Sequence, residues 1–288
     1  ALYFFLKNIN NNSKSSKGII VTSFTCDSVV NSVINSGFNP ILIDIESDNY
    51  SIDLDDLKSV DLSTYSIILL QHTFGLPAKY INEIVKFGKI NKKIIIEDCS
   101  LSLFAKFNGK SLGSFGDASI FSFELSKSIT TQRGGCLIIN NDAINLNNFN
   151  LIYKNTPRRK KLLNFKKSLQ IILSSYIYNS KFYNIWFFLL KFLYNTHIFE
   201  KSTPAIENKG LINNNYLEKM DENFKNLLIA QLIIKDDLIK INKDNLNYIY
   251  SKVTNQKYKD RIRYLLNFNY LIRLPLEIDN KENFINYN

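Results

Sequence analysis

Six short runs of apolar, β-branched residues lie between residue 18 and about residue 140, and segments of helical length separate several of them. The runs are GIIVTSF (18–24), PILIDI (40–45), SIILLQ (66–71), KIIIED (93–98), SIFSF (119–123) and CLIIN (136–140). Each run is too short for a buried helix and is bounded by turn residues. Strands that are buried on both faces and alternate with helices predict a layered α/β fold with a largely parallel sheet.

Helical patterns fill two of the intervals between these runs, DSVVNSVINSG (27–37) and AKYINEIVKFGKIN (78–91). Gly37 is a typical helix stop. A polar linker (200–210) precedes a last segment, and from residue 211 the pattern predicts a long helix followed by a short mixed region. The chain therefore divides into an α/β part and a C-terminal helical part.

The amino-acid composition limits the classes of binding partner but does not identify one of them. The 288 residues are 45% hydrophobic and 22% charged, which predicts a folded chain with one large and one smaller domain. The net charge of +10 admits nucleic acid, anionic lipid or phosphorylated small molecules. No nucleic-acid-binding module is recognisable, so we expect no nucleic-acid partner.

The three cysteines have no metal-ligand spacing, so we expect no metal site and free thiols in a reducing compartment, the cytoplasm. The N-terminal residues lack the basic start and the cleavage site of a signal peptide.

A basic and aromatic region follows the strand-rich part, with PRRKKLLNFKK at 157–167 and IILSSYIYNSKFYNIWFFLLKFLY after it. Lys181, Asn184 and Lys191 interrupt the apolar residues, so no stretch reaches the roughly 18 apolar residues of a membrane span. Two amphipathic helices are expected. They either pack on the sheet or on a partner subunit, or lie on an anionic membrane surface through 157–199.

Candidate catalytic residues follow from the strand order. Ligands of such sheets bind beyond the carboxyl ends of the strands, which singles out Asp98, the segment 122–127 and the loop after Gln71. Alone, Asp98 is an ordinary helix cap and Lys127 an ordinary surface lysine. Together, they sit at the ends of two predicted strands, near GSFGD (113–117) and the glycines of RGG (133–135). A lysine for a Schiff base, a carboxylate for a pyridinium nitrogen and hydroxyl groups for a phosphate suit pyridoxal phosphate.

Several motifs occur in one order with characteristic spacing: VTSFTCDSVVNSVINSGFNPILIDIESDNYSIDLDDL, HTFGLPAKYINEI, IIIEDCSLSLFAKFNGKSLGSFGDASIFSF and SKSITTQRGGCLIIN. This arrangement strongly resembles the DegT/StrS-type family of pyridoxal-phosphate-dependent sugar aminotransferases. The resemblance covers about residues 1–145 and resumes more weakly at NNNYLEKMDENFKNLLIAQLIIKDDLIKINKDNLNYIY. It implies a three-layer α/β/α fold with a mostly parallel mixed sheet (fold type I), plus an incomplete small α+β C-terminal domain.

The resemblance also implies roles for individual residues. Lys127 would bind the cofactor covalently and then carry a proton between substrate and cofactor carbons. Asp98 would keep the pyridine nitrogen protonated, and Ser122 would bind the cofactor phosphate. His72 and Gly75 would lie near the cofactor without a catalytic role.

Three positions depart from the family pattern. Cys26 stands where the family usually has an aromatic residue stacked on the cofactor ring, and Leu101 where it has Gln or His near the phenolic oxygen. Arg133 replaces the glutamate of the Gly-Glu-Gly-Gly loop and is either a surface change or a contact to a substrate phosphate. The family's Ser-Gly-Thr loop would lie upstream of residue 1, and the chain ends early in the small domain, so we expect a longer natural protein.

The resemblance predicts an aminotransferase that moves an amino group from an amino acid, glutamate, to a nucleotide-linked keto-sugar for cell-surface glycan synthesis. Family members commonly form homodimers. Lys127 argues against the dehydratase branch, in which another residue replaces the lysine. The alternative is a degenerate paralogue that keeps the fold as a binding or regulatory subunit.

We expect a cofactor-binding domain at 1–150, a helical insertion at 151–210, and a linking helix with a partial small domain at 211–288.

Overall fold

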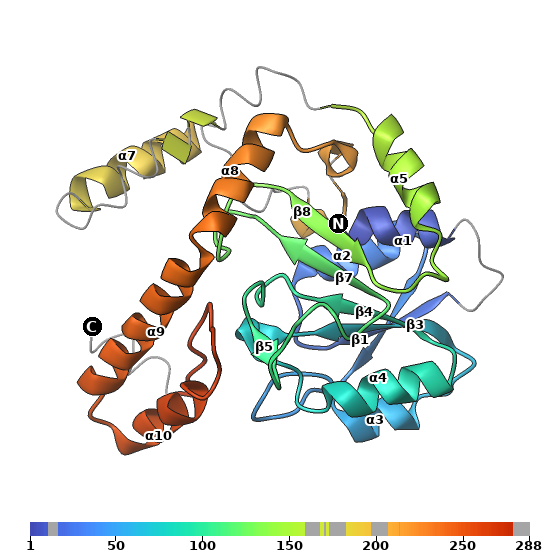
Figure 1. Ribbon diagram of the computed structural model, residues 1–288, viewed down its shortest axis with the longest axis horizontal. Helices are drawn as coiled ribbons and strands as arrows, with labels where there is room; N and C mark the ends of the chain where they lie inside the picture. The colour runs from blue at the N-terminus through green and yellow to red at the C-terminus, as the bar shows by residue number, and fades with distance from the viewer. Residues whose placement is uncertain are drawn as a thin grey trace.

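The computed structural model describes residues 1–10, 17–158, 168–169, 171–172, 183–196, 207–212 and 214–278. Its centre is a six-stranded sheet with the order β2-β1-β3-β4-β7-β8 (Figure 1). The strands are β1 (Gly18–Thr22), β2 (Asn39–Ile43), β3 (Tyr65–Gln71), β4 (Ile94–Asp98), β7 (Ala118–Ser122) and β8 (Gly135–Ile139). Each strand overlaps one of the six predicted runs, so the strand predictions are confirmed.

The sheet is mixed but mostly parallel, as predicted. Strands β2, β1, β3, β4 and β7 run parallel to their neighbours, whereas β8 pairs antiparallel to β7. Every residue of β1 is buried. Such continuous burial requires cover on both faces, because successive side chains of a strand point to opposite sides.

Helices provide this cover as two outer layers. Helices α1 (Leu2–Asn10) and α2 (Asp27–Asn35) contribute to one buried cluster, which includes Ile19, Ile67 and Ile96 of the sheet. Helices α3 (Leu54–Ser59) and α4 (Ile81–Ile90) contribute to a second cluster with the adjacent residues of the same strands, Ile20, Ile68 and Ile95. The expected three-layer α/β/α arrangement is therefore present (Figure 1).

Local signals explain most element boundaries. Helix α2 ends just before Gly37, which adopts a φ of 82°, as its role as a helix stop predicts. The short helix α3 is not predicted by periodicity, yet Asp53 caps it by accepting hydrogen bonds from the backbone N–H groups of Asp55 and Asp56.

The sequence patterns also do not predict a two-stranded hairpin that the structure contains. Strands β5 (Lys106–Phe107) and β6 (Lys110–Ser111) pair around Asn108 and Gly109, both at positive φ. This Asn-Gly pair has the conformation that tight hairpins require.

The C-terminal region is helical, but the predicted long helix from residue 211 is wrong in its start and its continuity. A short turn, η4 (Asn214–Leu217), precedes α8 (Glu222–Ile233), and Asp221 caps α8. Helix α9 (Lys235–Lys252) follows after a break at Ile234, and the two helices form one long rod (Figure 1). Helix α10 (Gln256–Leu265) comes next, and residues 214–278 contain no strand of either sheet.

In the sequence, helices α5 (Leu146–Asn155) and α7 (Tyr183–Asn195) come between β8 and α8. The basic residues 159–167 and the stretch 173–182, which include most of the first expected amphipathic helix, lie outside the described residues. On α7, the side chains of Phe187, Phe188 and Phe192 are exposed. Within the described parts of the chain, no helix is long and apolar enough to cross a membrane.

Candidate active site

The predicted site residues gather at the carboxyl edge of the sheet. Asp98 ends β4 and Ser122 ends the neighbouring strand β7. The register pairs Asp98 with Ile120, so Ser122 lies two residues further along the adjacent strand. Lys127 follows in the loop that joins β7 to β8. Strand order therefore brings a carboxylate, a hydroxyl and a lysine to one edge.

The loop that carries Lys127 is fixed at its base and at its side. Thr131 N–H donates to the Phe123 carbonyl and Phe123 N–H donates to the Gly134 carbonyl, each over 3.0 Å. The Gln231 side chain on α8 accepts from Thr130 N–H at 3.0 Å and donates to the Thr130 carbonyl at 2.9 Å. Helix α8 thus holds the loop in place, although about a hundred residues separate the two in the sequence.

The polar atoms of this site are available for a ligand. The Asp98 side chain is buried, and its Oδ1 accepts from Ser100 N–H at 2.9 Å. Among the described residues, no hydrogen bond reaches Asp98 Oδ2, Ser122 Oγ or Lys127 Nζ. In the same loop, the buried amide of Gln132 has no hydrogen-bond partner in the described structure. Buried polar atoms without partners are rare and require an explanation.

Gln132 is a residue that sequence reasoning missed. It occupies the first position of the Gly-Glu-Gly-Gly loop, where the family has glycine, and it adopts a φ of 63°. A long side chain is uncommon in this left-handed region, so its presence at a glycine position could have drawn attention from the sequence.

Cys26 lies at the same edge, but β3 separates its strand β1 from β4. Its segment is tied to β3, because Thr25 Oγ1 donates to Gln71 Oε1 at 2.6 Å and Gln71 Nε2 donates to the Phe24 carbonyl at 3.2 Å. The Cys26 thiol is exposed and accepts from Ser28 Oγ at 3.3 Å. The loop after Gln71 therefore belongs to this edge of the sheet, as expected.

Leu101 lies in the turn after β4, close to the loop after β3. A Cβ atom added to Gly75 would meet the Leu101 carbonyl at 2.9 Å, and Gly75 has a φ of 95°. The backbone of Leu271 and Ile272 approaches the same glycine. Gly75 is thus required for close packing of three chain segments.

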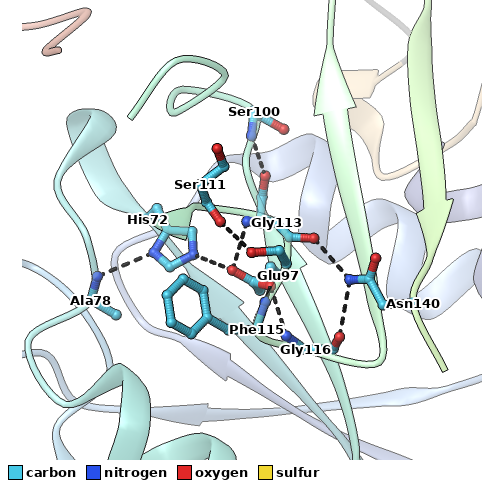
Figure 2. Close-up of polar contacts among 11 residues, drawn as sticks. His72, Ala78, Glu97, Ser100, Ser111, Gly113, Phe115, Gly116 and Asn140 are labelled. Carbon is cyan, nitrogen blue, oxygen red and sulfur yellow. Dashed lines mark hydrogen bonds and ion pairs between the residues drawn. The ribbon is translucent and has the colours of Figure 1, made fainter. Parts of the chain in front are cut away.

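The structure also reveals a buried carboxylate that the sequence did not single out, Glu97 (Figure 2). Its Oε1 accepts from the N–H groups of Phe115 at 2.6 Å and Gly116 at 2.7 Å. Its Oε2 accepts from Gly113 N–H at 2.8 Å and lies 3.0 Å from His72 Nε2. The side chains of Glu97 and His72 are both fully buried.

Hydrogen bonding determines the tautomer of His72. Ala78 N–H points at His72 Nδ1 over 3.1 Å, and a backbone N–H can only donate. Nδ1 is therefore the acceptor, and the ring proton resides on Nε2, which donates to Glu97 (Figure 2). Burial by itself raises the pKa of Glu97, but hydrogen bonds from His72, Gly116 and Gly113 outweigh it and lower that pKa below its usual value.

Cys99 completes a group that superficially resembles a metal site, since the ligand atoms of His72, Glu97 and Cys99 lie within 4.8 Å of one another. Both ring nitrogens of His72 are engaged, and both oxygens of Glu97 accept two hydrogen bonds each. Burial, together with the negative charge of Glu97, raises the pKa of the Cys99 thiol well above its usual value. We assign this group as a hydrogen-bond network, because no lone pair of His72 remains for a metal.

Residues 1–179 match the DegT/DnrJ/EryC1/StrS aminotransferase family. The chain belongs to this family. GDP-perosamine synthase of Escherichia coli O157:H7 is 31% identical over 126 residues, which are 44% of this chain and 34% of that protein. A UDP-N-acetyl-3-dehydro-alpha-D-glucosamine 3-aminotransferase of Acidithiobacillus ferrooxidans is 29% identical over 125 residues, 43% of this chain and 34% of that one. The aligned part thus spans about a third of the length of these relatives.

Among solved structures, the aminotransferase PseC of Helicobacter pylori superposes with a TM-score of 0.49 and 24% identity, over 56% of this chain and 42% of that one.

The cofactor of this family's aminotransferases is pyridoxal phosphate. The residues of the site fit this group, because Asp98 Oδ2, Ser122 Oγ and Lys127 Nζ make no hydrogen bond among the described residues, and the Asp98 side chain is buried. These are the three kinds of side chain that a protonated pyridine nitrogen, a phosphate and an aldehyde require.

Proposed function

We propose that the protein is an aminotransferase that uses pyridoxal phosphate to move an amino group from glutamate to a nucleotide-linked keto-sugar. The observation that supports it most is the gathering of Asp98, Ser122 and Lys127 at one sheet edge in a chain of this family. The relatives include proteins named for GDP- and UDP-linked sugars, which supports the nucleotide-sugar class. The glycan product, the donor and the cytoplasmic location stay predictions.

The bound cofactor would supply an electron-accepting ring on which an amino group can be exchanged. Lys127 would hold the cofactor covalently and, once released, carry a proton at its Nζ atom. Asp98 would accept a hydrogen bond from the ring nitrogen and keep the proton there, since a buried carboxylate favours a nearby positive charge. Ser122 would donate its hydroxyl to the phosphate.

Cys26 and Leu101 differ from the family pattern, and their positions in the structure indicate their effect on cofactor binding. Cys26 is exposed beside the N-terminus of α2, and its thiol offers less contact area to a ring than an aromatic side chain. Leu101 cannot donate a hydrogen bond to the phenolic oxygen. We expect both to weaken cofactor binding without abolishing it, because neither replaces Lys127, Asp98 or Ser122.

Titration with pyridoxal phosphate, followed by borohydride reduction and peptide mapping, tests the proposal. We expect a visible absorption band and a label on Lys127. A Lys127→Ala variant should lose both, whereas the matched variant Lys110→Ala, at an exposed lysine of the β5–β6 hairpin, should retain them. A label scattered over surface lysines would reject the enzyme and favour the degenerate paralogue.

Amino transfer itself is tested with glutamate and a panel of GDP- and UDP-linked keto-sugars. Product formation that requires Lys127 supports the substrate class, whereas transfer only to simple keto acids would contradict it.

Two partner predictions concern the oligomer and the membrane. We propose a homodimer, which size-exclusion chromatography with light scattering tests. The membrane contact through 157–199 predicts flotation with anionic liposomes, and the exposed Phe187, Phe188 and Phe192 on α7 support this contact. Recovery of a dimer in the protein fraction, away from the lipid, would reject the membrane contact.

A further inference from the structure

Glu97 and His72 join three chain segments at the candidate site. Glu97 belongs to β4, His72 directly follows β3, and the turn Gly113–Gly116 leads into β7. The three backbone N–H groups of this turn converge on Glu97, and Asn140 Nδ2 donates to the carbonyls of Gly113 at 2.8 Å and Gly116 at 3.1 Å (Figure 2). The turn is therefore held from two sides.

This network lies beside the proposed cofactor site, on the opposite face of the sheet. Glu97 and Asp98 are consecutive residues of β4, so their side chains point to opposite faces. One peptide unit connects them, and His72 contacts both. Its ring donates to Glu97, and its backbone N–H donates to the Asp98 carbonyl at 3.2 Å. A change of the His72 side chain therefore acts on Asp98 through Glu97, whereas the backbone hydrogen bond between His72 and Asp98 remains.

We propose that Glu97 and His72 are positioning residues that fix the Asp98 carboxylate and the start of β7 for cofactor binding. This inference rests on the proposed function, because it assigns Asp98 to the cofactor. A side chain in such a site must be held to within about 0.5 Å. Four hydrogen bonds to a fully buried carboxylate supply this rigidity on the face that the cofactor does not occupy.

Two substitutions of His72 separate its two side-chain hydrogen bonds. In His72→Gln, the amide nitrogen can take the place of Nε2 and still donate to Glu97, while the acceptor for Ala78 is lost. In His72→Asn, the amide oxygen can take the place of Nδ1 and still accept from Ala78, while Glu97 loses its donor. Each variant removes one side-chain hydrogen bond, the one to the charged Glu97 in His72→Asn and the one from Ala78 N–H in His72→Gln, so their cofactor affinities should differ.

The measurement is the apparent dissociation constant of pyridoxal phosphate, together with amide hydrogen exchange at Gly113, Phe115 and Gly116. We expect His72→Asn to weaken binding about tenfold, equivalent to about 1.4 kcal/mol, and to speed exchange in the turn. We expect His72→Gln to stay within about threefold of the unaltered protein. Asp61→Asn, at an exposed turn carboxylate outside this network, is the control for a substitution elsewhere in the chain and should match the unaltered protein in both measurements.

The outcomes are distinct. Equal affinities for the unaltered protein, His72→Asn and His72→Gln would overturn the positioning role, even if exchange in the turn increases. Equal losses in both variants would also overturn it, because they would reflect general destabilisation. If the unaltered protein forms no reducible band on Lys127, the proposed function fails, and the positioning role fails with it.

Discussion

Replacing Glu97 with glutamine tests the buried hydrogen-bond network most directly. The substitution keeps the shape of the side chain but exchanges one acceptor oxygen for an NH₂ group. If the remaining oxygen stays opposite Phe115 and Gly116, the new amide nitrogen faces the N–H of Gly113 and the Nε2–H of His72. Two hydrogen bonds are lost, and the new NH₂ group, itself a donor, faces two other donor groups.

The magnitude follows from this count. Each lost hydrogen bond at a buried charged acceptor costs about 1.5 kcal/mol, so Glu97→Gln should lower the free energy of unfolding by about 3 kcal/mol. Domains of this kind have total stabilities of about 5–15 kcal/mol, so the variant should still fold. Turning the amide round does not help, because its nitrogen would then face Phe115 and Gly116. Neither rotamer restores four acceptor contacts.

Urea denaturation followed by circular dichroism measures the loss, with Asp61→Asn as the control for removal of an exposed turn carboxylate. The pH dependence adds an independent check. The folded state has a lower pKa at Glu97 than the unfolded chain, so the stabilisation is present above the unfolded value of about 4.3 and is lost as pH falls through the folded value. The difference between Glu97→Gln and the unaltered protein should therefore shrink in acid.

A loss below about 1 kcal/mol at neutral pH would refute the reasoning, since it would mean that Glu97 is not the common acceptor of four donors. A difference that grows as the pH falls would contradict the ionised state that we assign to Glu97.

Three further predictions concern packing, thiols and a helix cap. Gly116→Ala would place a Cβ atom 2.8 Å from the Ile95 carbonyl and should lower the free energy of unfolding by about 1–3 kcal/mol in the same urea assay. Iodoacetamide at pH 8 should alkylate the exposed Cys26 well before the buried Cys99, as mass spectrometry of a time course can measure, and equal rates would contradict the burial of Cys99. Asp53→Ala removes the acceptor at the N-terminus of α3 and should cost about 1 kcal/mol in thermal unfolding, whereas Asp53→Asn should cost less.

The predicted strands show how much the local pattern determines. Continuous apolar runs such as IIVT and IIIED specify strands buried on both faces, and the structure confirms all six. The rule that parallel strands present their carboxyl ends at one edge then places Asp98 and Ser122 together, as the register of β4 and β7 shows. The order of the motifs predicted the family, and the match of residues 1–179 to the family confirms this prediction.

The C-terminal helices show where local pattern is insufficient. A single long helix from residue 211 is compatible with periodicity, but the chain begins its helix after the cap Asp221 and breaks it at Ile234. The contact between Gln231 and Thr130 joins residues about a hundred positions apart, and no local signal predicts it.

The sequence by itself determined the class of fold, the family and the edge of the sheet at which Asp98, Ser122 and Lys127 lie. These features depend on local apolar runs and on the order of motifs. Only the tertiary structure showed that Glu97 collects four donors and that His72 carries its proton on Nε2. The reason is physical: the partners of a buried carboxylate come from segments 16–25 residues away, and only packing of β3, β4 and the turn before β7 brings them within hydrogen-bond distance.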